Sequence, residues 1–157
     1  MKMEKPSCRH FVYAIVILSS LALPFDKAAQ AANMSNLIGQ RFTEVREDKN
    51  KVINGKSYMV RKELLINRAD GTKTNIERYY AGSHRVSETI VTYKWGVENN
   101  VYWSVCQTVL ENGTASACSY RSEYNIISAA PQEIRYKSRT TGVTYASRRV
   151  PDRFRLP

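Results

Sequence analysis

The stretch that decides the fold is residues 87–114, S-E-T-I-V-T-Y-K-W-G-V-E-N-N-V-Y-W-S-V-C-Q-T-V-L-E-N-G-T. Apolar and polar side chains alternate along it, which predicts extended strands with two different faces. One face of the first strand carries Thr89, Val91, Tyr93 and Trp95. Turn residues interrupt the alternation at 98–100 and again at 111–113. We therefore expect two consecutive antiparallel hairpins here.

The first turn decides which side chains of its two strands face each other. If residues 98–100 form a three-residue loop, Trp95 lies opposite Trp103 and Tyr93 lies on the same face. These three aromatic residues are then candidates to line a pocket for a small apolar ligand. The alternative is that the aromatic side chains fill the core.

The second turn brings two cysteines together. A three-residue loop with Gly113 in the left-handed position pairs Cys106 with Cys118 when the register is counted back. Opposed residues have a Cα separation that a disulfide tolerates, about 4.4–6.8 Å, so we expect this disulfide. Free buried cysteines are the alternative. A metal site is not expected, because two thiols and His84 do not supply four ligands.

Apolar and polar side chains also alternate outside residues 87–114, around residues 39–45, 58–66, 76–80, 133–139 and 143–147. About 7–8 strands joined by short turns predict an all-β fold, an antiparallel meander that forms a small barrel-like domain. A two-layer β-sandwich is the alternative. Pro151 and Pro157 make residues 150–157 an irregular basic tail, which we expect along the surface with Phe154 and Leu156 as tethers.

One short segment, Leu37-Ile38-Gly39-Gln40-Arg41-Phe42, is similar to the opening strand of lipocalin-type barrels. In that family a glycine precedes a buried tryptophan by two positions, and here Arg41 stands where the tryptophan would be. The resemblance implies no ligand-binding residue for this chain.

The first 31 residues have the three parts of a cleavable secretory signal peptide. Basic residues precede an apolar run at 11–23, and Ala29-Gln30-Ala31 offers small residues to a peptidase. The run is shorter than the roughly 20 residues that span a bilayer. We expect cleavage after Ala31, export to the periplasm or medium, and a single domain over residues 32–157 without a membrane anchor. An uncleaved anchor is the alternative.

The chain is basic: 20 Lys and Arg oppose 12 Asp and Glu after residue 31. Guanidinium groups bind phosphate and carboxylate in bidentate geometry, so arginine-rich surfaces suit anionic partners. We expect an anionic envelope lipid or polysaccharide to bind a basic face formed by Arg135, Lys137, Arg139, Arg148 and Arg149. Nucleic acid is not expected, because the sequence holds no motif that recognises it.

No catalytic motif is present. His84 lies in the turn-like stretch Gly82-Ser83-His84-Arg85. Candidate carboxylates are Glu63, Glu77, Glu88 and Glu123, and paired-carboxylate chemistry needs two of them to meet across a cleft. We therefore expect an exported, non-enzymatic binding or structural protein without a cofactor. The oligomeric state stays open.

Overall fold

Nine strands and one short helix make up residues 34–157, which the computed structural model describes. The predicted signal peptide, residues 1–31, lies outside the described residues. The helix is α1 (Met34–Leu37), and the strands are β1 (Gly39–Ile53), β2 (Lys56–Asn67), β3 (Thr72–Ala81), β4 (His84–Glu98), β5 (Val101–Glu111), β6 (Thr114–Ala117), β7 (Arg121–Ala129), β8 (Glu133–Ser138) and β9 (Thr144–Arg149). No helix in this part of the chain is long and apolar enough to cross a membrane.

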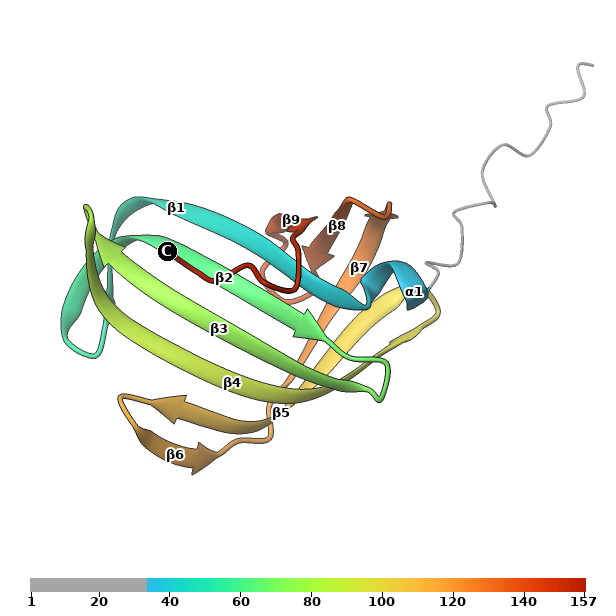
Figure 1. Ribbon diagram of the computed structural model, residues 1–157, viewed down its shortest axis with the longest axis horizontal. Coiled ribbons are helices and arrows are strands. Elements are labelled where there is room, and N and C mark those ends of the chain that lie inside the picture. Colours follow the sequence, from blue (N-terminus) through green and yellow to red (C-terminus); the bar gives the residue numbers. More distant parts are fainter. Residues whose placement is uncertain (1–33) are drawn as a thin grey trace, which may run out of the picture.

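Eight of the strands close into an antiparallel barrel, which confirms the predicted fold class. The strand order is β4-β3-β2-β1-β9-β8-β7-β5, and pairing between β4 and β5 completes the ring. β6 pairs only with the second half of β5, so this hairpin projects from the barrel wall (Figure 1). Closure leaves no long unpaired edge in the eight-stranded ring, which is a physical reason for a barrel rather than a sandwich.

The hairpin between β4 and β5 has a shorter loop than the sequence predicted. Asn99 and Asn100 both have positive φ angles, 49° and 62°, and Glu98 pairs directly with Val101. Asparagine tolerates this conformation, so a two-residue turn that matches the strand twist replaces the three-residue loop. The register changes by one residue and pairs Trp103 with Gly96. The prediction that both tryptophans share one face is therefore wrong.

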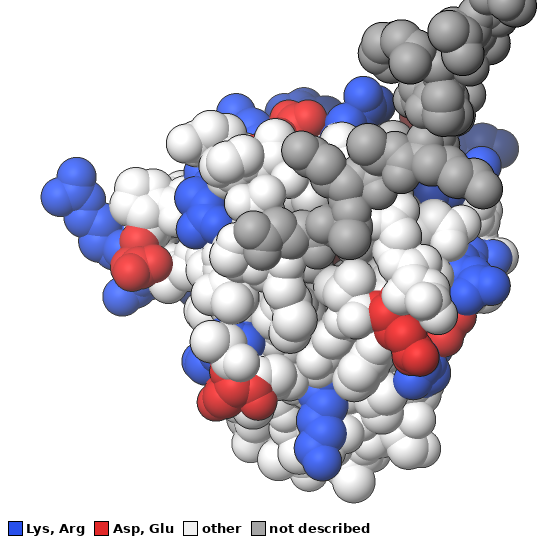
Figure 2. Space-filling view, turned by 90° about the vertical axis from the view of Figure 1, so that its right-hand side faces the viewer, with Lys and Arg blue, Asp and Glu red and all other residues white. Residues whose placement is uncertain are grey.

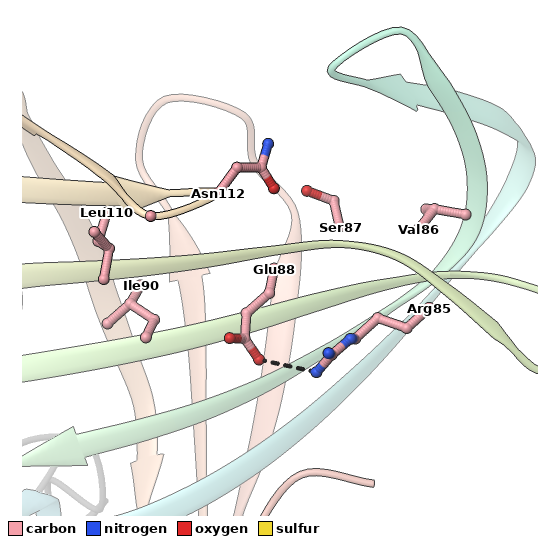
Figure 3. Close-up of a pocket in the computed structure, with 8 residues that line it drawn as sticks. Arg85, Val86, Ser87, Glu88, Ile90, Leu110 and Asn112 are labelled. Carbon is pink, nitrogen blue, oxygen red and sulfur yellow. Dashed lines mark hydrogen bonds and ion pairs between the residues drawn. The ribbon is translucent and has the colours of Figure 1, made fainter.

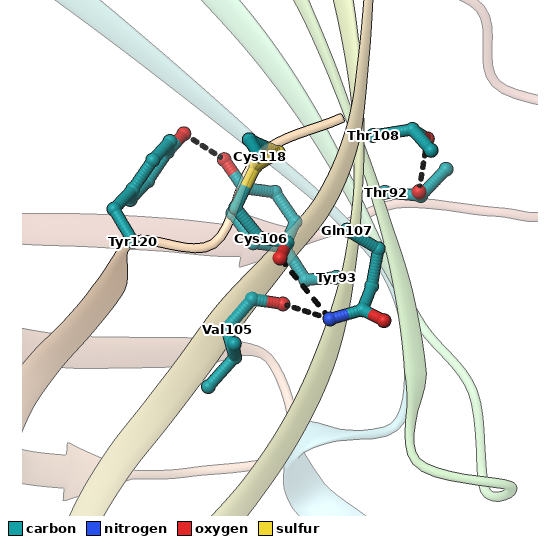
Figure 4. The surroundings of a disulfide bond; sticks show 8 residues. All are labelled: Thr92, Tyr93, Val105, Cys106, Gln107, Thr108, Cys118 and Tyr120. Carbon is teal, nitrogen blue, oxygen red and sulfur yellow. Dashed lines mark hydrogen bonds between the residues drawn. A yellow bond between two sulfur atoms is a disulfide. The ribbon is translucent and has the colours of Figure 1, made fainter. Parts of the chain in front are cut away.

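The Cys106–Cys118 disulfide is present, with a Cα separation of 5.4 Å. The predicted loop is again wrong, because Asn112 and Gly113 form a two-residue turn with positive φ angles. An extra residue in β5, Gln107, interrupts the pairing with β4. Its carbonyl accepts a hydrogen bond of 3.2 Å from the amide of Cys118, which lies one residue beyond β6. Figure 4 shows Gln107 next to Cys106, the first cysteine of the disulfide. The bulge therefore brings Cys106 within reach of Cys118.

The C-terminal tail crosses the outer face of the barrel, as predicted (Figure 1). The ring of Phe154 lies 5.5 Å from that of Phe42, and only 6% of Leu156 is exposed. Arg78 donates a hydrogen bond of 2.6 Å to the carbonyl of Leu156. Phe154 and Leu156 are thus the tethers that the sequence indicated.

An apolar cluster closes one end of the barrel beneath α1. We call it the floor cluster, and it consists of Leu37, Trp95, Tyr102, Ile126, Ile134 and Tyr136. The indole nitrogen of Trp95 donates to the carbonyls of Arg68 and Thr72, at 3.1 and 2.9 Å. The space left among these side chains is only about 20 Å³. This end of the barrel is therefore a packed core.

Candidate functional site

Beyond the floor cluster, the barrel interior holds a cavity of about 210 Å³, which we call the chamber. Four charged residues line it: Arg61, Glu63, Lys73 and Glu77. Five buried or half-buried tyrosines line it as well: Tyr93, Tyr102, Tyr124, Tyr136 and Tyr145. Buried charges are costly unless they are compensated, so their concentration inside the barrel marks the chamber as the candidate site.

The charged residues reach the interior through the two-residue period of β2 and β3. Residues 61, 63, 65 and 67 of β2 point inward, as do 73, 75, 77 and 79 of β3. Glu63 lies directly opposite Glu77 in the register, and Lys73 lies opposite Asn67. Glu63 and Glu77 were among the candidate carboxylates of the sequence, whereas Arg61 and Lys73 were not among its candidate residues, although the alternation of polar residues was a visible signal.

The two chamber carboxylates have partners of their own. Glu63 forms an ion pair of 2.7 Å with Arg61. Glu77 accepts a hydrogen bond of 2.7 Å from the side chain of Asn75 and another from the hydroxyl of Tyr79. Burial, reinforced by the charge of Glu77, raises the pKa of Glu63 to about 7, against the opposing effect of Arg61. Glu63 therefore titrates near neutral pH.

Lys73 is the most enclosed cation of the chamber, with 6% of the residue exposed. Its Nζ lies 4.7 Å from the ring centroid of Tyr93 and 5.2 Å from that of Tyr102. Burial opposes its charge, but the phenolic oxygens of Tyr102 and Tyr124 and the carboxylate of Glu63 outweigh burial and raise its pKa. Lys73 forms no ion pair with any residue of the described chain.

A wall of tyrosines faces the charged side. Tyr124, Tyr136 and Tyr145 come from β7, β8 and β9, and each ring contacts the other two at centroid distances of 5.2–6.3 Å. In the ring of eight strands, β8 lies four places from β3, on the opposite side. A ligand in the chamber would therefore meet cationic and acidic groups on one side and aromatic rings on the other.

Tyr120 stands at the side of the chamber where the disulfide lies (Figure 4). Its hydroxyl group is 3.2 Å from that of Tyr93, and the two rings meet edge to face at 6.3 Å. Half of Tyr120 is exposed, 51%. β5 pairs with β7 as far as Val105 and Arg121, and the amide of Cys106 donates a hydrogen bond of 2.9 Å to the carbonyl of Tyr120 just beyond that pair.

Of the three aromatic residues predicted to line a pocket, only Tyr93 lines the chamber. Trp95 belongs to the floor cluster and is 3% exposed. Trp103 lies on the outer face, where its ring packs over Gly96 and under the guanidinium of Arg121, 5.0 Å from the ring. A Cβ at position 96 would lie 2.6 Å from this ring, so glycine is required there.

Arg149 does not belong to the predicted basic face. It points into the α1 end of the barrel and donates hydrogen bonds to the carbonyls of Pro131 and Ile38, at 2.9 and 2.8 Å. Arg41 lies beside it, 2% exposed, and donates to the carbonyl of Asn36. Burial, together with the charge of Arg149, lowers the pKa of Arg41 to about 10. The two arginines tie α1 to the barrel.

The other predicted basic residues are exposed. Arg135, Lys137 and Arg148 lie on the outer face of β8 and β9, and none of them forms an ion pair within residues 34–157. Arg139 differs, because it pairs with Glu123 at 2.8 Å, next to the Arg121–Glu123 pair. Viewed at the α1 end, basic side chains are spread around the rim with acidic ones among them (Figure 2).

A shallower hollow of about 340 Å³ lies outside the barrel, between β4 and the projecting β5–β6 hairpin (Figure 3). Ile90 and Leu110 form its apolar part, and Arg85 pairs with Glu88 at 3.3 Å across the other part. Unlike the chamber, this hollow contains no buried cation. His84 is exposed at the start of β4, outside the chamber.

No three His, Cys, Asp or Glu side chains of the described chain gather where they could hold a metal ion. No protein-family model matches the chain, and no curated protein matches it in sequence. The class of protein is therefore defined by its own geometry: an antiparallel eight-stranded β-barrel with an aromatic cluster inside.

Proposed function

We propose that this protein is an exported carrier that binds a small polar molecule in the chamber without changing it chemically. The observation that carries the proposal is the chamber itself: a cavity of about 210 Å³ where charged side chains are enclosed among tyrosines. Ligand sites are concave, and the polar groups that converge in them fix the orientation of the ligand. The Cys106–Cys118 disulfide is compatible with an oxidising, exported environment.

The polar character of the chamber favours a polar ligand over an apolar one. A ligand without hydrogen-bonding groups would leave Glu63, Lys73 and Glu77 desolvated with no new partner. The volume corresponds to roughly seven water molecules at about 30 Å³ each, which suits a ligand with a single ring or a short chain.

The test is native mass spectrometry of the protein purified from its own compartment, compared with two variants of β7. Ser122 lines the chamber, so Ser122→Trp should fill part of it. Asn125 is exposed on the other face of the same strand, which makes Asn125→Trp the matched control. We expect a retained small molecule in the unaltered protein and in Asn125→Trp, and at least tenfold less of it in Ser122→Trp.

Equal retention by Ser122→Trp and Asn125→Trp, with both variants folded, would place the ligand outside the chamber and refute the proposal. A mass that always equals the bare chain with one disulfide would refute it as well. The same spectrum reports the mature N-terminus, and a start at Ala32 is expected if the signal peptide is cleaved.

A second candidate function is contact with an anionic lipid or polysaccharide of the cell envelope through Arg135, Lys137 and Arg148. It is supported by the exposure of these three cations and by the absence of ion pairs to them within the described chain. Vesicles with and without an anionic lipid test it by co-sedimentation. The triple change to Glu should abolish binding to anionic vesicles, and binding should weaken steeply with salt.

The matched control for this test reverses three exposed lysines of the β1–β2 hairpin, Lys49, Lys51 and Lys56. It changes the net charge by the same amount but leaves β8 and β9 intact. Equal loss of vesicle binding in both triple variants would mean that net charge alone, and not this face, causes the attraction.

A further inference from the structure

Lys73 and Glu77 are the two charged groups of the chamber that form no ion pair within the described chain. Arg61 and Glu63 form an ion pair of 2.7 Å, and the two oxygens of Glu77 accept hydrogen bonds from the neutral side chains of Asn75 and Tyr79. Within the described chain, the Lys73 ammonium group lies over the rings of Tyr93 and Tyr102, and the carboxylate of Glu63 acts on its charge without forming an ion pair with it. With 6% of the residue exposed, solvent gives it little compensation.

Lys73 faces the space in the chamber that a ligand would occupy. It lies at the deep side of the chamber, opposite Asn67 in the register, where the floor cluster begins. The side-chain amide of Asn67 already donates a hydrogen bond of 3.0 Å to the carbonyl of Leu37. Across the barrel from β3, Tyr136 and Tyr145 stack with a centroid distance of 5.7 Å. An anionic group beside Lys73 would thus leave the ligand body against these rings.

We infer that the chamber ligand is a small organic acid whose carboxylate pairs with Lys73 and whose body packs against the tyrosines of β7–β9. This inference rests on the proposed carrier function. A cationic ligand is disfavoured, because the acidic groups that could attract it already have donors and Lys73 would repel it. A neutral ligand would give the Lys73 ammonium group no ion-pair partner.

The test compares 4-hydroxybenzoate with its neutral isostere 4-hydroxybenzamide and with 4-hydroxybenzylamine, by isothermal titration of the dialysed full protein. We expect the acid to bind at least about tenfold more tightly than the amide, because the ammonium donates a stronger hydrogen bond to a charged carboxylate than to the neutral carbonyl of the amide. Lys73→Met should remove this preference, and Lys73→Arg should keep it. Lys94→Met is the matched control, since Lys94 is exposed on neighbouring β4.

Equal affinities for the acid and the amide, or tightest binding of the amine, would overturn the inference while leaving the carrier function intact. If none of the probes binds, the ligand retained in native mass spectrometry decides: a ligand with no acidic group overturns the inference. An empty chamber overturns both proposals. Should Lys73→Met fail to fold, the comparison of probes on the unaltered protein and Lys73→Arg still gives the answer.

Discussion

The two ends of the barrel interior differ in what their side chains do. The floor cluster is apolar and leaves about 20 Å³ unfilled, whereas the chamber encloses four charged residues around about 210 Å³. Tyr102 and Tyr136 belong to both and form the boundary. A packed apolar end stabilises the fold, which allows the other end to keep buried charges that contribute little to stability. Substitutions at the two ends are therefore expected to change the free energy of unfolding by different amounts.

The largest effect is expected for Trp95→Ala in the floor cluster. The change removes a side chain that is 3% exposed and leaves a cavity, so the free energy of unfolding should fall by roughly 3–5 kcal/mol. Urea denaturation measures it. The control is Ser122→Ala in the chamber, for which we expect a loss within about 0.5 kcal/mol. Similar losses in both variants would contradict the division between the two ends.

Removing the disulfide should come next. The double variant Cys106→Ser and Cys118→Ser frees a short loop, which costs about 3 kcal/mol in the chain-entropy account of disulfides. Urea denaturation with and without a reducing agent measures the loss. The unaltered protein should fall to the stability of the variant when it is reduced, and the variant itself should not respond. A variant as stable as the oxidised protein would show that the β5–β6 hairpin needs no covalent link.

Arg149 and Arg41 allow a comparison at the α1 end. Arg149→Met should lower the free energy of unfolding by about 2 kcal/mol, because the carbonyl of Ile38 loses its donor and that of Pro131 loses the closer of its two donors. Arg41→Met should have an effect near zero or stabilise the protein slightly. Two of the Arg41 nitrogens, Nε and Nη1, have no hydrogen-bond partner.

The carbonyls that Arg41 contacts, those of Asn36 and Pro131, also accept from Arg149, so Arg41→Met leaves both with a donor. Thermal unfolding of the two single variants measures the difference. A larger loss from Arg41→Met than from Arg149→Met would show that the more deeply buried arginine is the one that holds α1 in place.

The smallest effect concerns Glu63 and depends on pH. Its pKa is about 7 in the folded protein and near 4.5 in the unfolded chain, so the protonated form favours folding. The stability that it contributes is present below about pH 4.5 and is lost as the pH rises through 7. Between pH 6 and 8, the stability of the unaltered protein should therefore fall by roughly 1–2 kcal/mol through the ionisation of Glu63, and Glu63→Gln should remove this part of the fall.

Urea midpoints of the unaltered protein and of Glu63→Gln at pH 6 and pH 8 measure this change. Glu98→Gln, at an exposed carboxyl group beside the β4–β5 turn, is the control and should keep the pH dependence of the unaltered protein. Parallel pH profiles for all three proteins would mean that Glu63 is ionised throughout the range.

Much of the fold follows from local patterns in the sequence. Alternation and turn residues predicted the antiparallel strands and the barrel, and the spacing of Cys106 and Cys118 predicted the disulfide. The two loop lengths were wrong by one residue, because Asn99 and Asn112 adopt left-handed conformations that asparagine tolerates without requiring them. The predicted disulfide is nevertheless present, because the bulge at Gln107 shifts the register of β5 locally.

The candidate site could not be predicted in the same way. A two-residue period tells which side chains share a face, but not which face turns inward. On β2, Leu64 and Glu63 are both buried, and only closure of the barrel places Glu63 in the chamber while Leu64 lies on the opposite face. Arg149 likewise follows the pattern of the basic strands, yet it turns into the barrel end to bind carbonyls around α1.

The sequence by itself therefore determined the strands, the disulfide pair and the tethers of the C-terminal tail, since these depend on neighbours along the chain or on one hairpin. Only the tertiary structure decided that Arg61, Glu63, Lys73 and Glu77 meet tyrosines from β7–β9. The physical reason is that the chamber exists only once eight strands close. Its charges lie on β2 and β3 and the facing tyrosines on the opposite wall of the barrel, and no local pattern in the sequence encodes that arrangement.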